Sequence, residues 1–252
     1  MTIDRPKPEQ IPQLRQLWQQ AFGDTDEFLN VFFTTAYAPE RCRCVTVTGQ
    51  VAAALYWFDC ACQEQKFAYL YAVATGRAFQ NQGLCRALME NTHAHLQALG
   101  YRGAILVPGS RQLFALYKKL RYRVCSYIQE FSCAAGEDPV SLRPVGADEY
   151  AALRRQLLPA GGVTQEGATL SLLAAQGGFY AGDGILLAAT QAEGKLLCSE
   201  LLGPADAAAG ILAALGASSG RFRCPGGDKP FAMYLPLAED AISPSYFGLA
   251  LD

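Results

Sequence analysis

The segment that decides the fold runs from Lys66 to Gly100 and reads KFAYLYAVATGRAFQNQGLCRALMENTHAHLQALG. Its first part, Phe67 to Thr75, is a nearly continuous apolar run rich in aromatic and β-branched residues, which is typical of a strand buried on both faces. Its last part, Leu84 to Leu99, repeats apolar residues at helical spacing, and the following Gly100 is placed to close a helix. The segment therefore predicts a buried strand, a short polar turn and a helix.

The turn Gln80-Asn81-Gln82-Gly83-Leu84-Cys85 leads directly into the N-terminus of this helix. Exposed backbone N–H groups and the positive end of the helix dipole favour an anion at such a turn, and a pyrophosphate suits it well. Gly83 would let the backbone approach the phosphates closely. The turn lacks the Lys-Ser or Lys-Thr of a Walker loop and does not read GxGxxG. The alternative interpretation is an ordinary strand–turn–helix connection.

The turn resembles the acetyl-CoA loop of the GNAT superfamily of N-acetyltransferases, written Gln/Arg-x-x-Gly-x-Gly/Ala. Gln80 and Gly83 match this pattern, and Cys85 stands where Gly or Ala is expected. A second segment, from Leu113 to Tyr122, resembles the tyrosine-bearing helix of the same family. Tyr117 takes the place of that tyrosine, while Arg121-Tyr122 replaces a Gly-Phe turn.

The resemblance implies an α/β fold with a mixed sheet, the GNAT acyl-CoA N-acyltransferase fold, and acetyl-CoA as co-substrate. It implies that the backbone of Ala72, Val73 and Ala74 pairs with pantetheine and polarises the thioester carbonyl, as an oxyanion site does. It also implies that Tyr117 protonates the departing thiolate, although a core tyrosine on an amphipathic helix is the alternative. The residues implied to hold the pyrophosphate follow one another in the chain: Gln80, Asn81, Gln82, Gly83, Leu84, Cys85 and Arg86.

Transfer to an amine also requires a base or a desolvating pocket, because an alkylamine with a pKa of about 10.4 is almost fully protonated at pH 7. Asp59 and Glu130 are candidates, each on a predicted strand, and Tyr69 with Tyr71 could position a water. The C-terminal carboxylate of Asp252 is a further candidate, by likeness to the enhanced-intracellular-survival acetyltransferases. The base stays open. Five aromatic residues would suit a partly apolar cationic amine, or simply form core: Phe28, Phe32, Tyr56, Trp57 and Tyr71.

Two domains are predicted: an acetyl-CoA-binding GNAT domain over residues 1–135 and a degenerate GNAT-like domain over residues 140–252. The linker is Gly136-Glu137-Asp138-Pro139. Arg143-Pro144 followed by an amphipathic helix resembles Arg5-Pro6 and its helix, which suggests a duplicated unit. In the second unit, Leu202-Gly203-Pro204-Ala205-Asp206 stands in place of the phosphate loop, and Asp206 disfavours an anion there. A closing strand is expected at Tyr246–Leu251.

The nine cysteines are an odd number without a secretion signal, so no disulfide framework is predicted. A hairpin of Cys42–Thr48 and Val51–Asp59, turning at Gly49-Gln50, would place Cys42 opposite Trp57 and Cys44 opposite Leu55. The pairs Cys42/Cys44 and Cys60/Cys62 then do not converge, and no metal site is predicted.

The chain has 252 residues, 51% of them hydrophobic and 17% charged, with a net charge of −2. This composition is typical of a globular protein and disfavours a nucleic-acid or anionic-membrane partner. The beginning, MTIDRPKPEQ, does not read as a signal peptide, and no apolar run approaches the roughly 18 residues of a membrane helix. We therefore expect a cytoplasmic protein. A homodimer is left open.

The leading hypothesis is an acetyl-CoA-dependent N-acetyltransferase acting on a primary amine of a small molecule or protein. The departures at Cys85 and Arg121-Tyr122 motivate an alternative, a non-catalytic acyl-CoA-binding or sensor module. A third hypothesis is an aminoacyl or longer-acyl transferase built on tandem GNAT units.

Overall fold

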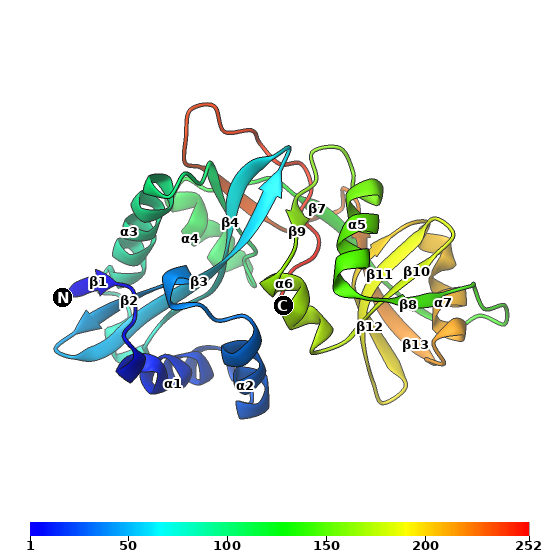
Figure 1. Ribbon diagram of the computed structural model, residues 1–252, viewed down its shortest axis with the longest axis horizontal. Coiled ribbons are helices and arrows are strands. Elements are labelled where there is room, and N and C mark those ends of the chain that lie inside the picture. Colours follow the sequence, from blue (N-terminus) through cyan, green and yellow to red (C-terminus); the bar gives the residue numbers. More distant parts are fainter. Residues whose placement is uncertain (252) are drawn as a thin grey trace. The chain divides into compact units, whose positions relative to one another are not determined.

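The computed structural model describes residues 1–251 and has a mixed α/β architecture (Figure 1). These residues fall into two compact units, each assembled from separate stretches of the chain. Unit 1 comprises Met1–Asp59, Gln65–Leu106 and Leu235–Ala241. Unit 2 comprises Cys60–Glu64, Val107–Tyr234 and residues 242–251. The predicted division of the chain at residues 135–140 stays a prediction.

Unit 1 is built on a sheet in which the strands follow the order β1-β2-β3-β4-β5. The first three strands pair antiparallel, whereas β4 and β5 pair in parallel from Phe67↔Gly103 to Tyr69↔Ile105. A parallel pair needs a crossover, and helix α3 (Leu84–Ala98) supplies it. The predicted strand–turn–helix is thus confirmed. The strands are β1 (Thr2–Asp4), β2 (Cys42–Val47), β3 (Gln50–Cys62), β4 (Gln65–Thr75) and β5 (Gly103–Leu106).

Helices α1 (Ile11–Phe22) and α2 (Asp26–Thr35) pack on one face of this sheet. Thr25 caps α2, because its hydroxyl accepts the N–H of Phe28 at 3.2 Å. Trp18 of α1 is 2% exposed, and its ring centroid lies 4.5 Å from that of Phe32 and 5.1 Å from that of Tyr56 on β3. Burial of these rings fixes the two helices against the sheet.

The β2–β3 hairpin differs from the predicted one. Its turn is Thr48-Gly49, with φ of 46° and 83°, and the register shifts at a bulge between Val45 and Thr46, just before the turn. Because of these two changes, Cys42 lies opposite Tyr56 and Cys44 lies opposite Ala54, so the predicted register is wrong by one residue. A one-residue slip moves every side chain to the other face of a strand. Cys42 therefore shares its face with Tyr56.

Unit 2 contains a seven-stranded sheet with the order β14-β7-β13-β12-β11-β10-β8. Strands β12 and β13 pair in parallel, and helix α7 (Ala208–Ala214) connects them. The helix packs on the sheet through a buried cluster that includes Leu187, Leu196, Ile211 and Phe222. The remaining elements are α4 (Arg111–Lys119), β6 (Arg123–Val124), β7 (Tyr127–Ala134), β8 (Arg143–Val145), α5 (Ala147–Leu157), β9 (Thr164–Gln165), α6 (Ala168–Ala174), β10 (Gly178–Gly182), β11 (Ile185–Ala192), β12 (Lys195–Leu202), β13 (Ser219–Pro225), β14 (Lys229–Pro230) and β15 (Met233–Pro236).

The order of elements from β8 to β13 repeats the order from β1 to β5, apart from the short strand β9. Each series consists of a short strand, two helices, three antiparallel strands, a helix and a strand that pairs in parallel with the preceding one. A degenerate GNAT-like second domain stays a prediction that this order favours.

The C-terminal segment is not the expected strand, because other groups take up its backbone carbonyls. The N–H of Val163 donates to Tyr246 O at 2.9 Å, and Ser126 Oγ donates to Phe247 O at 2.9 Å. The side-chain amide of Gln165 donates to Leu249 O at 2.7 Å. The apolar residues of this segment are therefore buried without a ladder.

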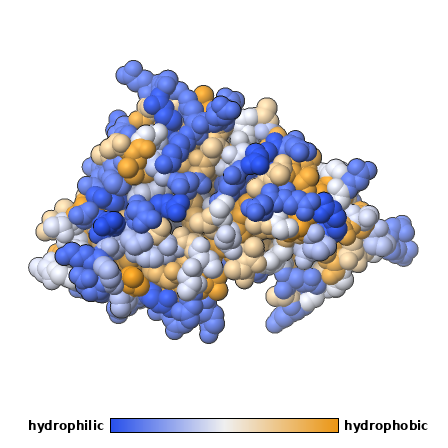
Figure 2. Space-filling model, viewed as in Figure 1, coloured by the Kyte–Doolittle hydropathy of each residue, from blue (hydrophilic) through white to orange (hydrophobic). Residues whose placement is uncertain are grey.

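The face shown in Figure 2 is mostly hydrophilic, with hydrophobic residues scattered between the polar ones. Across residues 1–251, no helix has the length and apolar character needed to cross a membrane.

Candidate functional site

The connection between β4 and α3 presents a row of backbone N–H groups. A 3-10 turn, η3 (Arg77–Phe79), follows β4, and Gly83 is the N-cap of α3 with a φ of 78°. Asn81 also has a positive φ, of 61°. Left-handed residues next to right-handed ones turn successive N–H groups toward the same side, which forms an anion-binding concavity.

These N–H groups have no acceptor within the part of the chain that the structure describes. The first backbone hydrogen bond of the helix runs from Ala87 N to Gly83 O, at 3.0 Å, and no protein group accepts the N–H groups of Asn81 to Arg86. No side chain caps the helix, and its first turn holds no acidic residue. The turn can therefore bind an anion such as a diphosphate.

Two glutamine side chains brace this turn from within. The side-chain amide of Gln82 donates to Ala78 O at 3.0 Å, and that of Gln80 donates more weakly to Thr75 O at 3.4 Å. Leu84 is 7% exposed and anchors the start of α3 in the core. The polar residues Gln80, Asn81, Gln82 and Arg86 are exposed.

Cys85 occupies the second position of α3 and is partly buried. Burial raises the pKa of its thiol, so the thiol stays protonated and uncharged at neutral pH. Such a cysteine packs as a small hydrophobic residue. Its chemistry is therefore compatible with a position at which Gly or Ala is expected.

Strand β4 continues beyond its pairing with β5. The ladder ends at Tyr69↔Ile105, whereas β4 runs on to Thr75, so in the described residues of unit 1 the β5 side of Ala72, Val73 and Ala74 carries no strand. Ala72 has a φ of 48°, which is costly for a residue with a Cβ and bends the strand. The backbone there is available to pair with an extended, amide-bearing ligand.

Tyr117 lies on the buried side of α4 in unit 2 and is 6% exposed. Ser110 caps α4 by accepting the N–H of Leu113 at 3.3 Å. The helix closes with a hydrogen bond from Tyr122 N to Tyr117 O, at 3.0 Å, and Arg121 takes a φ of 69°. The β4–α3 turn belongs to unit 1, and the role of Tyr117 stays a prediction.

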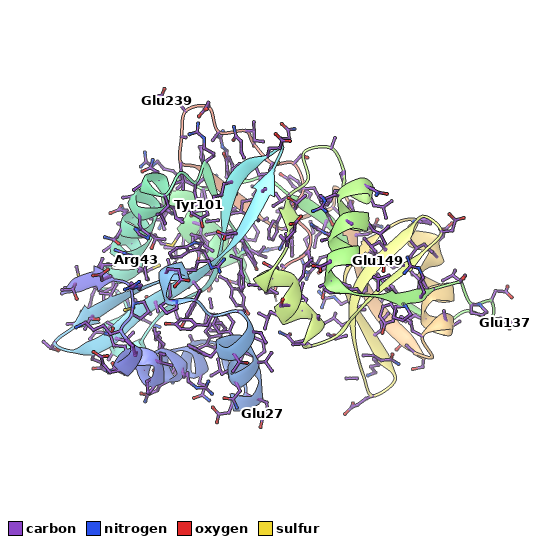
Figure 3. All side chains as sticks on the ribbon, in the orientation of Figure 1. Glu27, Arg43, Tyr101, Glu137, Glu149 and Glu239 are labelled. Atoms are coloured by element: carbon purple, nitrogen blue, oxygen red, sulfur yellow. The ribbon has the colours of Figure 1, made fainter. Side chains whose placement is uncertain are left out.

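Asp59, one of the candidate bases, is held by structural contacts. Arg41 donates to its Oδ2 at 2.8 Å, and the hydroxyl of Tyr101 (labelled in Figure 3) donates to its Oδ1. That hydroxyl in turn accepts the indole N–H of Trp57 at 3.2 Å. Both carboxylate oxygens of Asp59 are thus engaged, which disfavours a role as base.

Glu130, the second candidate, contacts Arg221 at 3.0 Å and also Lys229. Burial alone would raise the pKa of Glu130, but these cations lower it overall, which makes the carboxylate a weaker base. The third candidate, Asp252, lies outside the described residues.

Four of the five aromatic residues selected from the sequence gather around Trp18, which was not among the five. Trp18 stands between Phe28, Phe32, Tyr56 and Tyr71, at ring-centroid distances of 4.5 to 6.0 Å. Phe32 and Tyr56 are 1% and 4% exposed, so they belong to the core.

Trp57 does not join this group. Its ring lies 6.0 Å from that of His95, on α3, and its N–H donates to Tyr101. Successive side chains of a strand point to opposite faces, so the sequence alone could have placed Tyr56 and Trp57 on different faces of β3. Tyr69 and Tyr71 share a face as expected, with ring centroids 6.1 Å apart.

All nine cysteines are free thiols. Over residues 1–251 no group of three or more His, Cys, Asp or Glu side chains is placed to hold a metal ion.

Comparisons with known proteins point to one family. Residues 2–125 match the family model of the acetyltransferase (GNAT) domain. Among solved structures, a GCN5-related N-acetyltransferase from Anabaena variabilis is similar with a TM-score of 0.75 and 14% identity, over 94% of this chain and 73% of that one. A GCN5-related N-acetyltransferase from Kribbella flavida is similar with a TM-score of 0.71 and 16% identity, over 94% of this chain and 72% of that one. A third, from Sphaerobacter thermophilus, is similar with a TM-score of 0.59 and 14% identity, over 98% of each chain. No curated protein matches the sequence.

Proposed function

Residues 2–125 belong to the GNAT superfamily, whose members are acyltransferases, and from this premise we propose that the protein is an acetyl-CoA-dependent N-acetyltransferase. Its acceptor is a primary amine of a small molecule or protein, and its location is the cytoplasm. The observation that carries the proposal is the row of N–H groups from Asn81 to Arg86, which has no acceptor among the described residues and no acidic neighbour in the first turn. A diphosphate satisfies these donors.

Acetyl-CoA supplies an activated acetyl thioester, and the chain supplies binding and polarisation. We assign the diphosphate to Gln80, Asn81, Gln82, Gly83, Leu84, Cys85 and Arg86. The backbone of Ala72, Val73 and Ala74 aligns the pantetheine arm, since the β5 side of these residues carries no strand in unit 1. N–H groups at this strand also polarise the reacting carbonyl.

Tyr117 is assigned as the acid that protonates the leaving thiolate. This assignment rests on its place in the helix that resembles the tyrosine-bearing helix of the family. No base is assigned, because Asp59 and Glu130 are both engaged by cations.

The test is thioester turnover with a panel of amines, comparing the wild type with Tyr117→Phe. If Tyr117 is the acid, the variant binds acetyl-CoA as the wild type does and loses roughly 100-fold or more in kcat. Equal, appreciable rates would remove Tyr117 from the mechanism. Phe is matched in shape, so circular dichroism of both proteins controls for folding.

The alternative is a non-catalytic acyl-CoA-binding module. Tight binding of acetyl-CoA together with no turnover of any amine would favour it and would overturn the enzymatic proposal. Preference for a long acyl-CoA would instead indicate a longer-acyl transferase.

A further inference from the structure

Unit 1 contains a second concave feature that the proposed function does not use. It is a cavity of about 740 Å³ between α1, the β2–β3 turn and η3, elements that Figure 1 shows in blue and cyan. This volume falls within the range of small-molecule sites. None of the residues from Gln80 to Arg86 lines it, although η3, which immediately precedes that turn, does. We call it the polar cavity and define it by Gln13, Gln16, Gln20, Thr48, Gln50 and Arg77.

Four glutamines line the polar cavity: Gln13, Gln16, Gln20 and Gln50. Gln13 is fixed in place, because its Oε1 accepts the N–H of Val51 at 2.7 Å. Within residues 1–251, the side chains of Gln16, Gln20 and Gln50 make no hydrogen bond to the protein. Each carboxamide offers two donors and one acceptor oxygen, so together they can bind a ligand with several hydroxyl or amide groups.

The charge of the lining is positive. Arg77 is its only ionisable side chain, and no described residue forms an ion pair with it. No carboxylate lines the cavity, so a cationic ligand meets a like charge without a counter-charge. An acceptor amine is therefore a poor fit, whereas a carboxylate or phosphate can form charge-assisted hydrogen bonds with the guanidinium.

Apolar side chains also line the cavity. Leu17 and Val51 are each 5% exposed and line it together with Phe79. Carbon-bound faces of a ligand can pack there while its polar groups reach the glutamines.

We propose that the polar cavity binds a small organic anion that carries several hydroxyl or amide groups, with its carboxylate or phosphate on Arg77 and its remaining polar groups on the glutamines. This site goes beyond the proposed acetyl transfer. Its occupant is neither acetyl-CoA nor the amine.

The test is calorimetric titration of the full chain with four hexose derivatives that differ mainly in charge: gluconate, glucose 6-phosphate, glucose and glucosamine. We expect saturable binding of one or both anions, weaker binding of glucose and none of glucosamine. The two anionic arms distinguish a carboxylate from a phosphate ligand. No saturable heat with either anion, or equal affinity for all four, would overturn the proposal.

Variants locate the site. Arg77→Gln should weaken binding of the anion by roughly tenfold or more, as expected for a lost hydrogen bond to a charged group, and Arg111→Gln, a matched exposed arginine outside the cavity, should not. Gln20→Glu combined with Arg77→Gln should reverse the preference and admit glucosamine. Anion binding that survives Arg77→Gln and is displaced by acetyl-CoA would place the anion at the β4–α3 turn and contradict the proposal. Neither titration needs turnover, so failure here leaves the acetyltransferase proposal standing.

Discussion

Gly83 shows how a single residue sets the geometry of the β4–α3 turn. Its φ of 78° is a left-handed conformation, and a Cβ added there would meet no atom within 4 Å. A substitution would therefore be opposed by backbone strain rather than by a clash, and left-handed backbone costs a residue with a Cβ about 1–2 kcal/mol.

We predict that Gly83→Ala lowers the free energy of unfolding by about 1 kcal/mol. It should also weaken acetyl-CoA binding roughly 5- to 30-fold, because alanine disfavours the left-handed backbone that the turn needs when it binds the ligand. Denaturant unfolding and calorimetry measure the two effects. Gly227→Ala is the control, since that glycine also has open space around its Cβ but no positive φ. Unchanged affinity in Gly83→Ala would show that the turn does not hold the ligand.

Arg121 also adopts a left-handed backbone conformation, although it carries a Cβ. It ends α4 at a φ of 69°, in the position that glycine usually fills in this type of helix end. The Arg121-Tyr122 departure from the Gly-Phe turn thus leaves the turn geometry in place.

We predict that Arg121→Gly raises the free energy of unfolding by about 0.5–1 kcal/mol, since glycine adopts this conformation without steric cost. Lys119→Gly, within α4, should lower it by about 1 kcal/mol. Urea unfolding of both variants checks the contrast, and a loss of stability in Arg121→Gly would contradict it.

At the scale of elements, a buried ion pair joins α5, β12 and the C-terminal segment of unit 2. Arg154 binds Glu200 through two hydrogen bonds of 2.6 and 2.9 Å, and the two side chains are 1% and 0% exposed. The hydroxyls of Tyr150 and Tyr246 also donate to Glu200, at 3.2 and 3.1 Å. Every group in this cluster is therefore satisfied by another.

We predict that Glu200→Gln destabilises the protein by about 3–5 kcal/mol, because it leaves a buried guanidinium without a counter-charge. The exposed pair of Arg143 and Glu149 (Glu149 is labelled in Figure 3) offers a matched control. Glu149→Gln should change the stability far less, because solvent screens this exposed pair. Similar losses in the two variants, measured by thermal unfolding, would refute the distinction.

Glu130 links β7 to the cations of β13 and β14, and this link depends on pH. Its folded-state pKa lies below the ordinary 4.5, because Lys229 and Arg221 outweigh the effect of burial. The stabilisation is therefore fully present above the unfolded-state pKa and is lost as pH falls through the folded-state value.

We predict that the difference in unfolding free energy between the wild type and Glu130→Gln is constant above about pH 5.5 and shrinks as pH falls below the ordinary, unfolded-state pKa of 4.5. Denaturant titrations across this range measure it. A difference in unfolding free energy that grows as the pH falls would contradict the prediction.

Regular elements followed from the sequence where apolar periodicity was strong. Strand β4 ends at Thr75 as expected and begins at Gln65, two residues before the apolar run, and α3 ends one residue earlier than expected. Prediction failed where a long-range or local irregularity decided the outcome. A turn one residue earlier than expected and a bulge at Val45/Thr46 changed the hairpin register, and hydrogen bonds from residues distant in sequence replaced the strand expected at the C-terminal end.

The candidate site was predictable only as far as its local motif. The residues of the β4–α3 turn form a contiguous segment, so their shared geometry could be expected. The hydrogen bonds from Arg41 and Tyr101 to the carboxylate of Asp59 could not be expected, because they join residues far apart in the chain.

At the scale of the whole molecule, the chain repeats one order of elements but carries one candidate diphosphate turn. The corresponding connection between β12 and α7 contains Pro204 and the exposed Asp206, which disfavour an anion. We therefore expect one molecule of acetyl-CoA bound per chain.

The most direct test of the central claim follows the backbone amide resonances of the isotope-labelled full chain by NMR while acetyl-CoA is added. We expect saturable binding with the largest chemical-shift changes at the amides of Asn81 to Arg86. No binding, or saturable binding whose largest changes lie away from this turn, would contradict it.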